Sequence, residues 1–325
     1  MVASALALVL ALAFGLLSTL PVAAEVPTSN PLADRYFFIP PGTPARAQVS
    51  AWATTRPADA SLIERIATQP TAIWLGHEYV AQGYVSSMVK KAAVQKALPV
   101  FVTYFLPHRD CGAYSAGGAE SPADYERWVR EIADAIGSNR VAIIVEPDAL
   151  SELGCWGPTL GRQQIALIRY SVIAFSRLPH AAVYIDAGNR PLGNEWISTM
   201  ALKLREAGIA HARGFAVNVA NYGSVPAETT YGRRLLAALH GSWHFVIDTS
   251  RDGRGWAPGY PWCNPPGRGL GPPPTASTHE PLVDAYLWIK LPGSSDGPCN
   301  GGPPAGQWWP DQALQLAKNA VSPAP

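Results

Sequence analysis

Short, largely apolar runs recur along the chain, and polar residues follow each of them. The runs are three to five residues long and do not alternate with polar positions, which predicts strands covered on both faces. Strands of this kind are typical of parallel sheets in α/β proteins. The predicted strands are Ala72–Leu75, Val100–Tyr104, Val141–Val145, Ala182–Ile185, Phe215–Val219, Phe245–Ile247 and Ala285–Ile289.

Segments with helical periodicity separate most of these strands. In one of them the apolar residues Trp196, Met200, Leu204 and Ala207 fall on one helix face. The alternation predicts an α/β fold with a helix-covered parallel sheet, either a barrel or a wide open sheet. No glycine-rich phosphate loop follows the first strand, which argues against a nucleotide-binding open sheet. Helix-like segments include Tyr125–Ile136, Arg162–Ser176, Glu195–Ala207 and Thr230–Leu239.

Composition narrows the class of partner. The 325 residues carry a formal charge of +1 and contain no Lys/Arg cluster, which argues against nucleic acid as a partner. Eleven Trp and twelve Tyr are many for this length, and such rings suit stacking on flat, ring-shaped ligands.

The amino-terminal segment is typical of an export signal. Residues 2–17 form an unbroken apolar run that leads to Val22-Ala23-Ala24, a small-residue cleavage site. The first basic residue is Arg35, and the run is long, so an uncleaved membrane anchor stays open as an alternative. We therefore expect a signal peptide over 1–24, a secreted domain over 25–325, and no stable membrane partner if the signal is cleaved.

Cysteine use agrees with export. The chain has Cys111, Cys155, Cys263 and Cys299, and in a secreted protein these predict two disulfides, with three connectivities possible. No CxxC spacing or His pairing indicates a metal site. Residues 251–281 are rich in Gly, Pro and Arg and are expected to form one long functional loop.

Polar side chains follow the predicted strands, at the edge where a parallel α/β barrel builds its active site. Two carboxyl groups flanking a sugar linkage are what glycoside hydrolysis requires, one as acid and one as base or nucleophile. Glu146 and Asp248 are interpreted as structural carboxylates. The candidate polar residues at this edge are Asp110, Asp148, Asp186, Asn221, Lys290 and Asp296.

At these residues the chain resembles glycoside hydrolase family 6, the inverting cellulases. The resemblance covers roughly residues 30–320 and is carried by seven ordered blocks. They are TYFLPHRDCGAYSAGG at 103–118, IIVEPDAL at 143–150, YIDAG at 184–188, NVANY at 218–222, HFVIDTSRDGRG at 244–255, WCNPPGRGLG at 262–271 and DAYLWIKLPGSSDG at 284–297.

The resemblance implies a role for each matched residue. Asp148 matches the general acid, and Asp110 matches the aspartate that raises the pKa of that acid and relays a proton through water. Asp296 matches the proposed base, and Asp186 matches a further carboxylate of the site. Tyr104 matches the tyrosine that crowds the sugar ring before the cleaved bond.

The resemblance also implies a distorted, single-domain barrel of about seven parallel strands. It implies Trp74, Asn221, Trp262 and Lys290 as substrate contacts. It pairs Cys111 with Cys155 and Cys263 with Cys299. No cofactor or metal is implied, and the expected partner is a β-glucan bound by a monomer. The short connections between the blocks resemble those of endo-acting bacterial members, so we expect an open cleft and internal cleavage.

Three positions depart from the family pattern. Asn189 and Leu192 replace a His and a Trp on the leaving-group side of the cleft, and Ser294 replaces a Glu. These changes leave two alternatives to a cellulose-cleaving enzyme. One is a carbohydrate-binding protein with weakened catalysis, and the other is a glucanase with a shifted preference, for example for mixed-linkage glucan.

Overall fold

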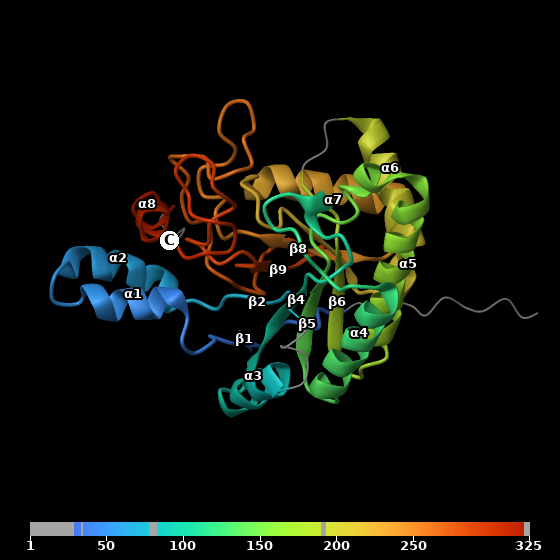
Figure 1. Ribbon diagram of the computed structural model, residues 1–325, viewed down its shortest axis with the longest axis horizontal. Helices are drawn as coiled ribbons and strands as arrows, with labels where there is room; N and C mark the ends of the chain where they lie inside the picture. Colours follow the sequence, from blue (N-terminus) through green and yellow to red (C-terminus); the bar gives the residue numbers. More distant parts are fainter. Residues whose placement is uncertain (1–28, 34, 78–82, 190–192, 322–325) are drawn as a thin grey trace, which may run out of the picture.

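A parallel, seven-stranded sheet forms the centre of the computed structural model (Figure 1). The structure describes residues 29–33, 35–77, 83–189 and 193–321. The strands follow the order β2-β4-β5-β6-β7-β8-β9, so each strand lies beside its sequence neighbours. Their bounds are Ile73–Leu75 (β2), Val100–Thr103 (β4), Val141–Val145 (β5), Ala181–Asp186 (β6), Gly214–Val217 (β7), His244–Asp248 (β8) and Val283–Leu287 (β9).

The sheet curls so that its two edge strands approach each other. The Ala72 amide donates to the Trp288 carbonyl at 3.0 Å, and Trp74 Nε1 donates to the Ile289 carbonyl at 2.8 Å. These bonds connect the ends of β2 and β9 without a regular ladder between them. The predicted distorted barrel of seven strands in a single domain is therefore confirmed.

Apolar residues fill both faces of the sheet, which explains why the strands do not alternate with polar positions. In β5, Ile143 and Val145 pack against the surrounding helices, whereas Ala142 and Ile144 point into the barrel. All five residues of this strand are fully buried. Such burial positions the carboxyl ends of the strands rigidly, and the polar residues beyond them inherit that rigidity.

Helices cover the outside of the curled sheet, and α1, α2 and α8 form a group at one side of the molecule (Figure 1). The four predicted helices are confirmed within α4 to α7, and the Ser121 hydroxyl caps α4 by accepting from the Asp124 amide at 3.2 Å. The bounds are Pro44–Trp52 (α1), Pro57–Ala67 (α2), Gly83–Val94 (α3), Pro122–Ile136 (α4), Gly157–Ser176 (α5), Asn194–Glu206 (α6), Val225–Leu239 (α7) and Pro310–Lys318 (α8).

Two strand ends differ from the prediction. The last strand ends at Leu287 rather than Ile289, because the Ile289 and Lys290 amides donate to the Asp248 carboxylate instead of to a neighbouring strand. The fifth predicted strand ends at Val217, because Asn218 turns the chain with a φ of 63°. The buried Asp248 thus replaces a stretch of ladder, which confirms its structural role.

The connection from β8 to β9 contains no helix or strand of its own in the described chain, as expected for 251–281. Its tip is exposed at Tyr260 and Trp262, but Arg251 and Asn264 are buried beneath it. The expected signal peptide at 1–24 lies outside the described residues. Within the described ranges, no helix has the length and apolar character needed to cross a membrane.

Candidate active site

The Glu146-Pro147-Asp148 segment at the end of β5 sends two carboxylates to different places. Glu146 is buried and accepts hydrogen bonds from the Phe105 and Leu106 amides and from the Tyr125 hydroxyl. It fastens the end of β4 to β5, as its structural interpretation predicted. Asp148 has a φ of 70°, a conformation that costs a non-glycine residue about 1–3 kcal/mol and is concentrated at functional sites.

Asp148 is held in an environment that keeps its proton. Burial, together with the nearby negative charges of Asp110 and Asp296, raises the pKa of Asp148 to about 6, although Lys290 opposes the shift. Among the described residues, none donates a hydrogen bond to its carboxyl oxygens. The group is therefore an acid whose proton is available to a ligand near neutral pH.

Asp186 lies directly beneath Asp148. Its Oδ2 accepts the Asp148 amide at 3.0 Å and the Gly188 amide at 3.2 Å. Burial and the charge of Asp148 raise the pKa of Asp186 well above its ordinary value. Asp186 therefore holds the backbone of Asp148 in place, and the structure brings these two predicted site residues together.

Tyr104 and Asp110 face Asp148 from the end of β4. The guanidinium of Arg109 lies 4.6 Å from the centre of the Tyr104 ring and donates to the Gly76 carbonyl at 3.0 Å. Burial raises the pKa of Asp110, while the Ser115 amide and Arg109 oppose that shift. Burial and the charges of Asp148 and Asp110 also raise the pKa of the Tyr104 hydroxyl, which therefore stays protonated.

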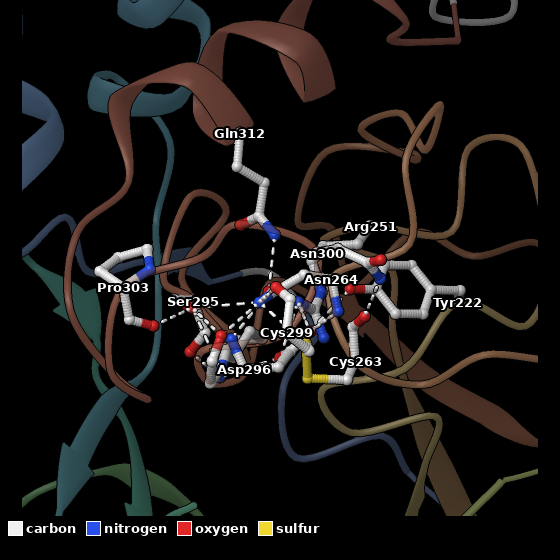
Figure 2. The surroundings of a disulfide bond; sticks show 12 residues. Tyr222, Arg251, Cys263, Asn264, Ser295, Asp296, Cys299, Asn300, Pro303 and Gln312 are labelled. Carbon is white, nitrogen blue, oxygen red and sulfur yellow. Dashed lines mark hydrogen bonds and ion pairs between the residues drawn. A yellow bond between two sulfur atoms is a disulfide. The ribbon is translucent and has the colours of Figure 1, made fainter.

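Asp296 sits in a dense network of donors (Figure 2). Arg251 Nη1 lies 2.9 Å from both of its carboxylate oxygens, and the Tyr222 hydroxyl donates to Oδ2 at 2.8 Å. The Asn264 amide donates at 3.0 Å, and Lys290 Nζ lies 3.4 Å from Oδ1. Despite burial, Arg251 and Lys290 lower the pKa of Asp296, so this carboxylate is ionised and a weak base.

Two disulfides fasten the loops that carry these groups. Cys111 is bonded to Cys155 and Cys263 to Cys299, the pairing that the resemblance implied. The first joins the residue after Asp110 to the loop after Asp148. The second lies beside Asn264, which also bonds the backbone of 297 and 299 (Figure 2).

A cavity of about 510 Å³ adjoins this group, and Trp74, Tyr104, Lys290 and Ser294 are among its lining residues. Tyr84 and Tyr114 add two further rings to its wall. Trp262 lies outside that wall, but its ring centre is 6.0 Å from that of Tyr114. The combination of flat rings and polar groups is what stacking and hydrogen bonding to sugar rings require.

The remaining predicted positions lie further from this group. Asn221 bonds to the Val219 carbonyl at 2.9 Å and is not in the cavity wall. Asn189 is half-buried at the turn after β6, and Leu192 lies outside the described residues. In the part of the chain that the structure describes, no three His, Cys, Asp or Glu side chains gather in a way that could hold a metal ion.

Sequence reasoning did not single out Arg251, Tyr222 and Asn264, which hold Asp296. Arg251 is completely buried. All three residues occur inside motifs that were recognised, at 244–255, 218–222 and 262–271. An Arg or Asn within a glycine-rich loop is normally a surface residue, so the sequence contained no sign of its burial.

A barrel whose strand ends carry a protonated Asp, an ionised Asp and a wall of rings defines the class of carboxylate-dependent glycoside hydrolases. The model of glycosyl hydrolases family 6 matches residues 32–320. The chain belongs to this family.

Relatives of known structure and name agree. The chain is 40% identical over 290 residues to Endoglucanase A of Cellulomonas fimi, covering 87% of this chain and 61% of that protein. It is 40% identical over 283 residues to Endoglucanase 1 of Streptomyces sp. (strain KSM-9), covering 84% of this chain and 77% of the relative. The solved endoglucanase Cel6 from Mycobacterium tuberculosis, in complex with methyl-cellobiosyl-4-deoxy-4-thio-β-D-cellobioside, superposes with a TM-score of 0.83 at 39% identity, covering 90% and 99% of the two chains.

Proposed function

We propose that this protein is an endo-acting glucanase that hydrolyses β-1,4-glucosidic bonds inside cellulose-like chains, with inversion at the anomeric carbon. The observation that carries the proposal is the Asp148 carboxyl. It is free of donors among the described residues, it faces Tyr104 and Asp110, and its pKa is raised to about 6. A group of this kind can protonate a leaving glycosidic oxygen near neutral pH.

In this mechanism a glucan chain lies along the ring-lined wall, with one sugar crowded by Tyr104. Asp148 gives its proton to the glycosidic oxygen as the bond to the anomeric carbon breaks. A water molecule attacks that carbon from the opposite face of the ring. The product is then the anomer opposite to the β-linkage.

Asp110 is the better acceptor for the proton that the attacking water loses. Its pKa is raised, whereas that of Asp296 is lowered by Arg251 and Lys290. Asp296 therefore contributes a fixed negative charge near the developing positive charge of the sugar ring. We assign it the role of electrostatic stabiliser and assign Asp110 a proton relay through water.

Internal cleavage is supported by the exposure of the rings along the cleft. Trp262 and Tyr114 are 54% and 50% exposed, which leaves room for a long chain to enter from the side. The relatives named endoglucanase are 40% identical to this chain, whereas a relative named cellobiohydrolase from Emericella nidulans is 30% identical. We also propose export, because two disulfides are typical of oxidising compartments.

The test is to follow viscosity and reducing ends together on soluble carboxymethyl cellulose and on mixed-linkage β-glucan. An endo-acting enzyme lowers viscosity early, at few cuts. The Asp148→Asn variant should lose about 10²–10⁴-fold in rate, the usual contribution of an acid catalyst. Binding of oligosaccharide without any cleavage by the wild type would instead support a binding protein, and a preference for mixed linkages would support the shifted specificity.

A further inference from the structure

A fourth carboxylate, Glu152, belongs to the neighbourhood of the acid, although no role has been given to it so far. The Glu152 amide donates to the Asp148 carbonyl at 3.0 Å, so the two residues are one turn of chain apart. Lys203 of α6 donates to the Leu150 carbonyl at 2.6 Å and holds this turn from outside. Glu152 is half-buried, so its side chain lies within the protein surface rather than extending into solvent.

The disulfide brings Glu152 to the Asp110 side of the site as well. Cys111 Sγ lies 3.6 Å from Glu152 Oε2 and 3.8 Å from its carbonyl oxygen. Cys111 is the neighbour of Asp110 in the sequence, and its partner Cys155 is three residues beyond Glu152. The position of Glu152 is therefore fixed on both sides, by the Asp148 turn and by the Asp110 loop.

The groups that act on Glu152 are mostly acidic. Burial and the charges of Asp148 and Asp110 raise the pKa of Glu152 to about 7. Glu152 in turn raises the pKa of Asp186 and Tyr104. The cations Lys290 and Arg109 act on Asp148 and Asp110 rather than on Glu152.

We propose that Glu152 is a positioning residue for the general acid, holding one proton jointly with Asp148 and so extending hydrolysis toward higher pH. This inference deepens the function proposed above, because it concerns the same acid. Two carboxyl groups that repel each other lose their protons in two steps that belong to the pair. When Glu152 is ionised, its charge favours the protonated form of Asp148.

The sign of the effect follows from that coupling. Without Glu152, Asp148 loses its proton in a single step at lower pH. The alkaline limb of kcat/KM should then move to lower pH, while the rate on the acid side of the profile stays near that of the wild type. A residue with a purely structural role would change the height of the profile and leave the position of the limb unchanged.

The experiment compares the kcat/KM pH profile on cellohexaose of the wild type with those of Glu152→Gln, Glu152→Asp and Glu64→Gln. Glu64 is an exposed residue of α2 and serves as the matched control. We expect the alkaline limb of Glu152→Gln to move down by about half a pH unit or more, and the other two profiles to keep the wild-type limb. An unchanged limb in a folded Glu152→Gln variant would overturn the proposal.

A second readout does not depend on activity. The Asp148 carboxyl carbon can be followed by NMR during a pH titration of the labelled protein. We expect a titration in two steps in the wild type and in Glu152→Asp, and in one step in Glu152→Gln. A single step in the wild type would overturn the inference. An inactive wild type with a two-step titration would count against the proposed hydrolysis alone.

Discussion

At the scale of single residues, the site places a destabilising charge where chemistry needs an acid. The pKa of Asp148 is raised to about 6, so its ionised form is disfavoured in the folded protein. A group with a raised pKa contributes stability below its unfolded value, and that stability is lost as pH rises through the folded value. The acid is thus maintained at a cost to the fold above pH 6.

The Asp148→Asn variant should therefore be more stable than the wild type at pH 7.5 and equal to it near pH 4. The expected gain is on the order of 2 kcal/mol, because each unit of pKa shift corresponds to about 1.4 kcal/mol. Urea unfolding at the two pH values measures this difference. A variant that is less stable than the wild type at pH 7.5 would contradict the assigned environment of Asp148.

Asp296 has the opposite character, since its charge is needed by the buried Arg251. Removing one partner of a buried pair costs about 3–5 kcal/mol, whereas an exposed pair is worth about 1 kcal/mol or less. We expect this large loss for Asp296→Asn at neutral pH, and a shrinking difference from the wild type as pH falls and Asp296 becomes protonated.

The matched control is Asp59→Asn, which breaks the surface pair of Asp59 with Arg56, a pair that is 2.7 Å long and partly exposed. Chemical denaturation of both variants compares the two environments. Equal, small losses would mean that Arg251 does not depend on Asp296.

The sequence predicted which carboxylates meet, because each follows a strand and parallel strands end at one edge. It did not predict Glu152 or Arg251. Their importance arises from burial and from contacts across long loops, such as that between Cys111 and Glu152, 41 residues apart. Neither burial nor such contacts leaves a periodic signal in the chain.

At the scale of elements, the strands could be predicted because burial on both faces leaves unbroken apolar runs. Their ends could not be predicted where a side chain replaces the ladder, as Asp248 does. The helices α1, α2 and α8 were not identified, although each has a Pro in its first turn, a known start signal. Their apolar faces pack on one another rather than on the sheet.

The loop from β8 to β9 is held by a disulfide rather than by secondary structure. Replacing Cys263 and Cys299 by Ala should lower the free energy of unfolding by about 4 kcal/mol in the chain-entropy account of such a loop. It should also reduce activity, because Asn264 next to Cys263 donates to Asp296. Replacing Cys111 and Cys155, which close a loop of similar length, gives the matched comparison. A loss below about 1 kcal/mol in both variants would contradict this account.

At the scale of the whole molecule, the barrel, the two disulfides and the ring-lined wall together define one open site. The proton donor and the ionised Asp296 come from strands at opposite parts of the sheet, β5 and β9. Only a closed or nearly closed sheet can bring such distant strand ends together. The central claim is therefore that this geometry hydrolyses a β-glucan with inversion and with Asp148 as the acid.

The most direct test is proton NMR of the products within the first minutes of reaction with a soluble β-1,4-glucan, for the wild type and Asp148→Ala. The account predicts that the wild type releases α-anomers, which then equilibrate slowly, and that the variant releases none. Initial release of β-anomers, or an undiminished rate in Asp148→Ala, would contradict it.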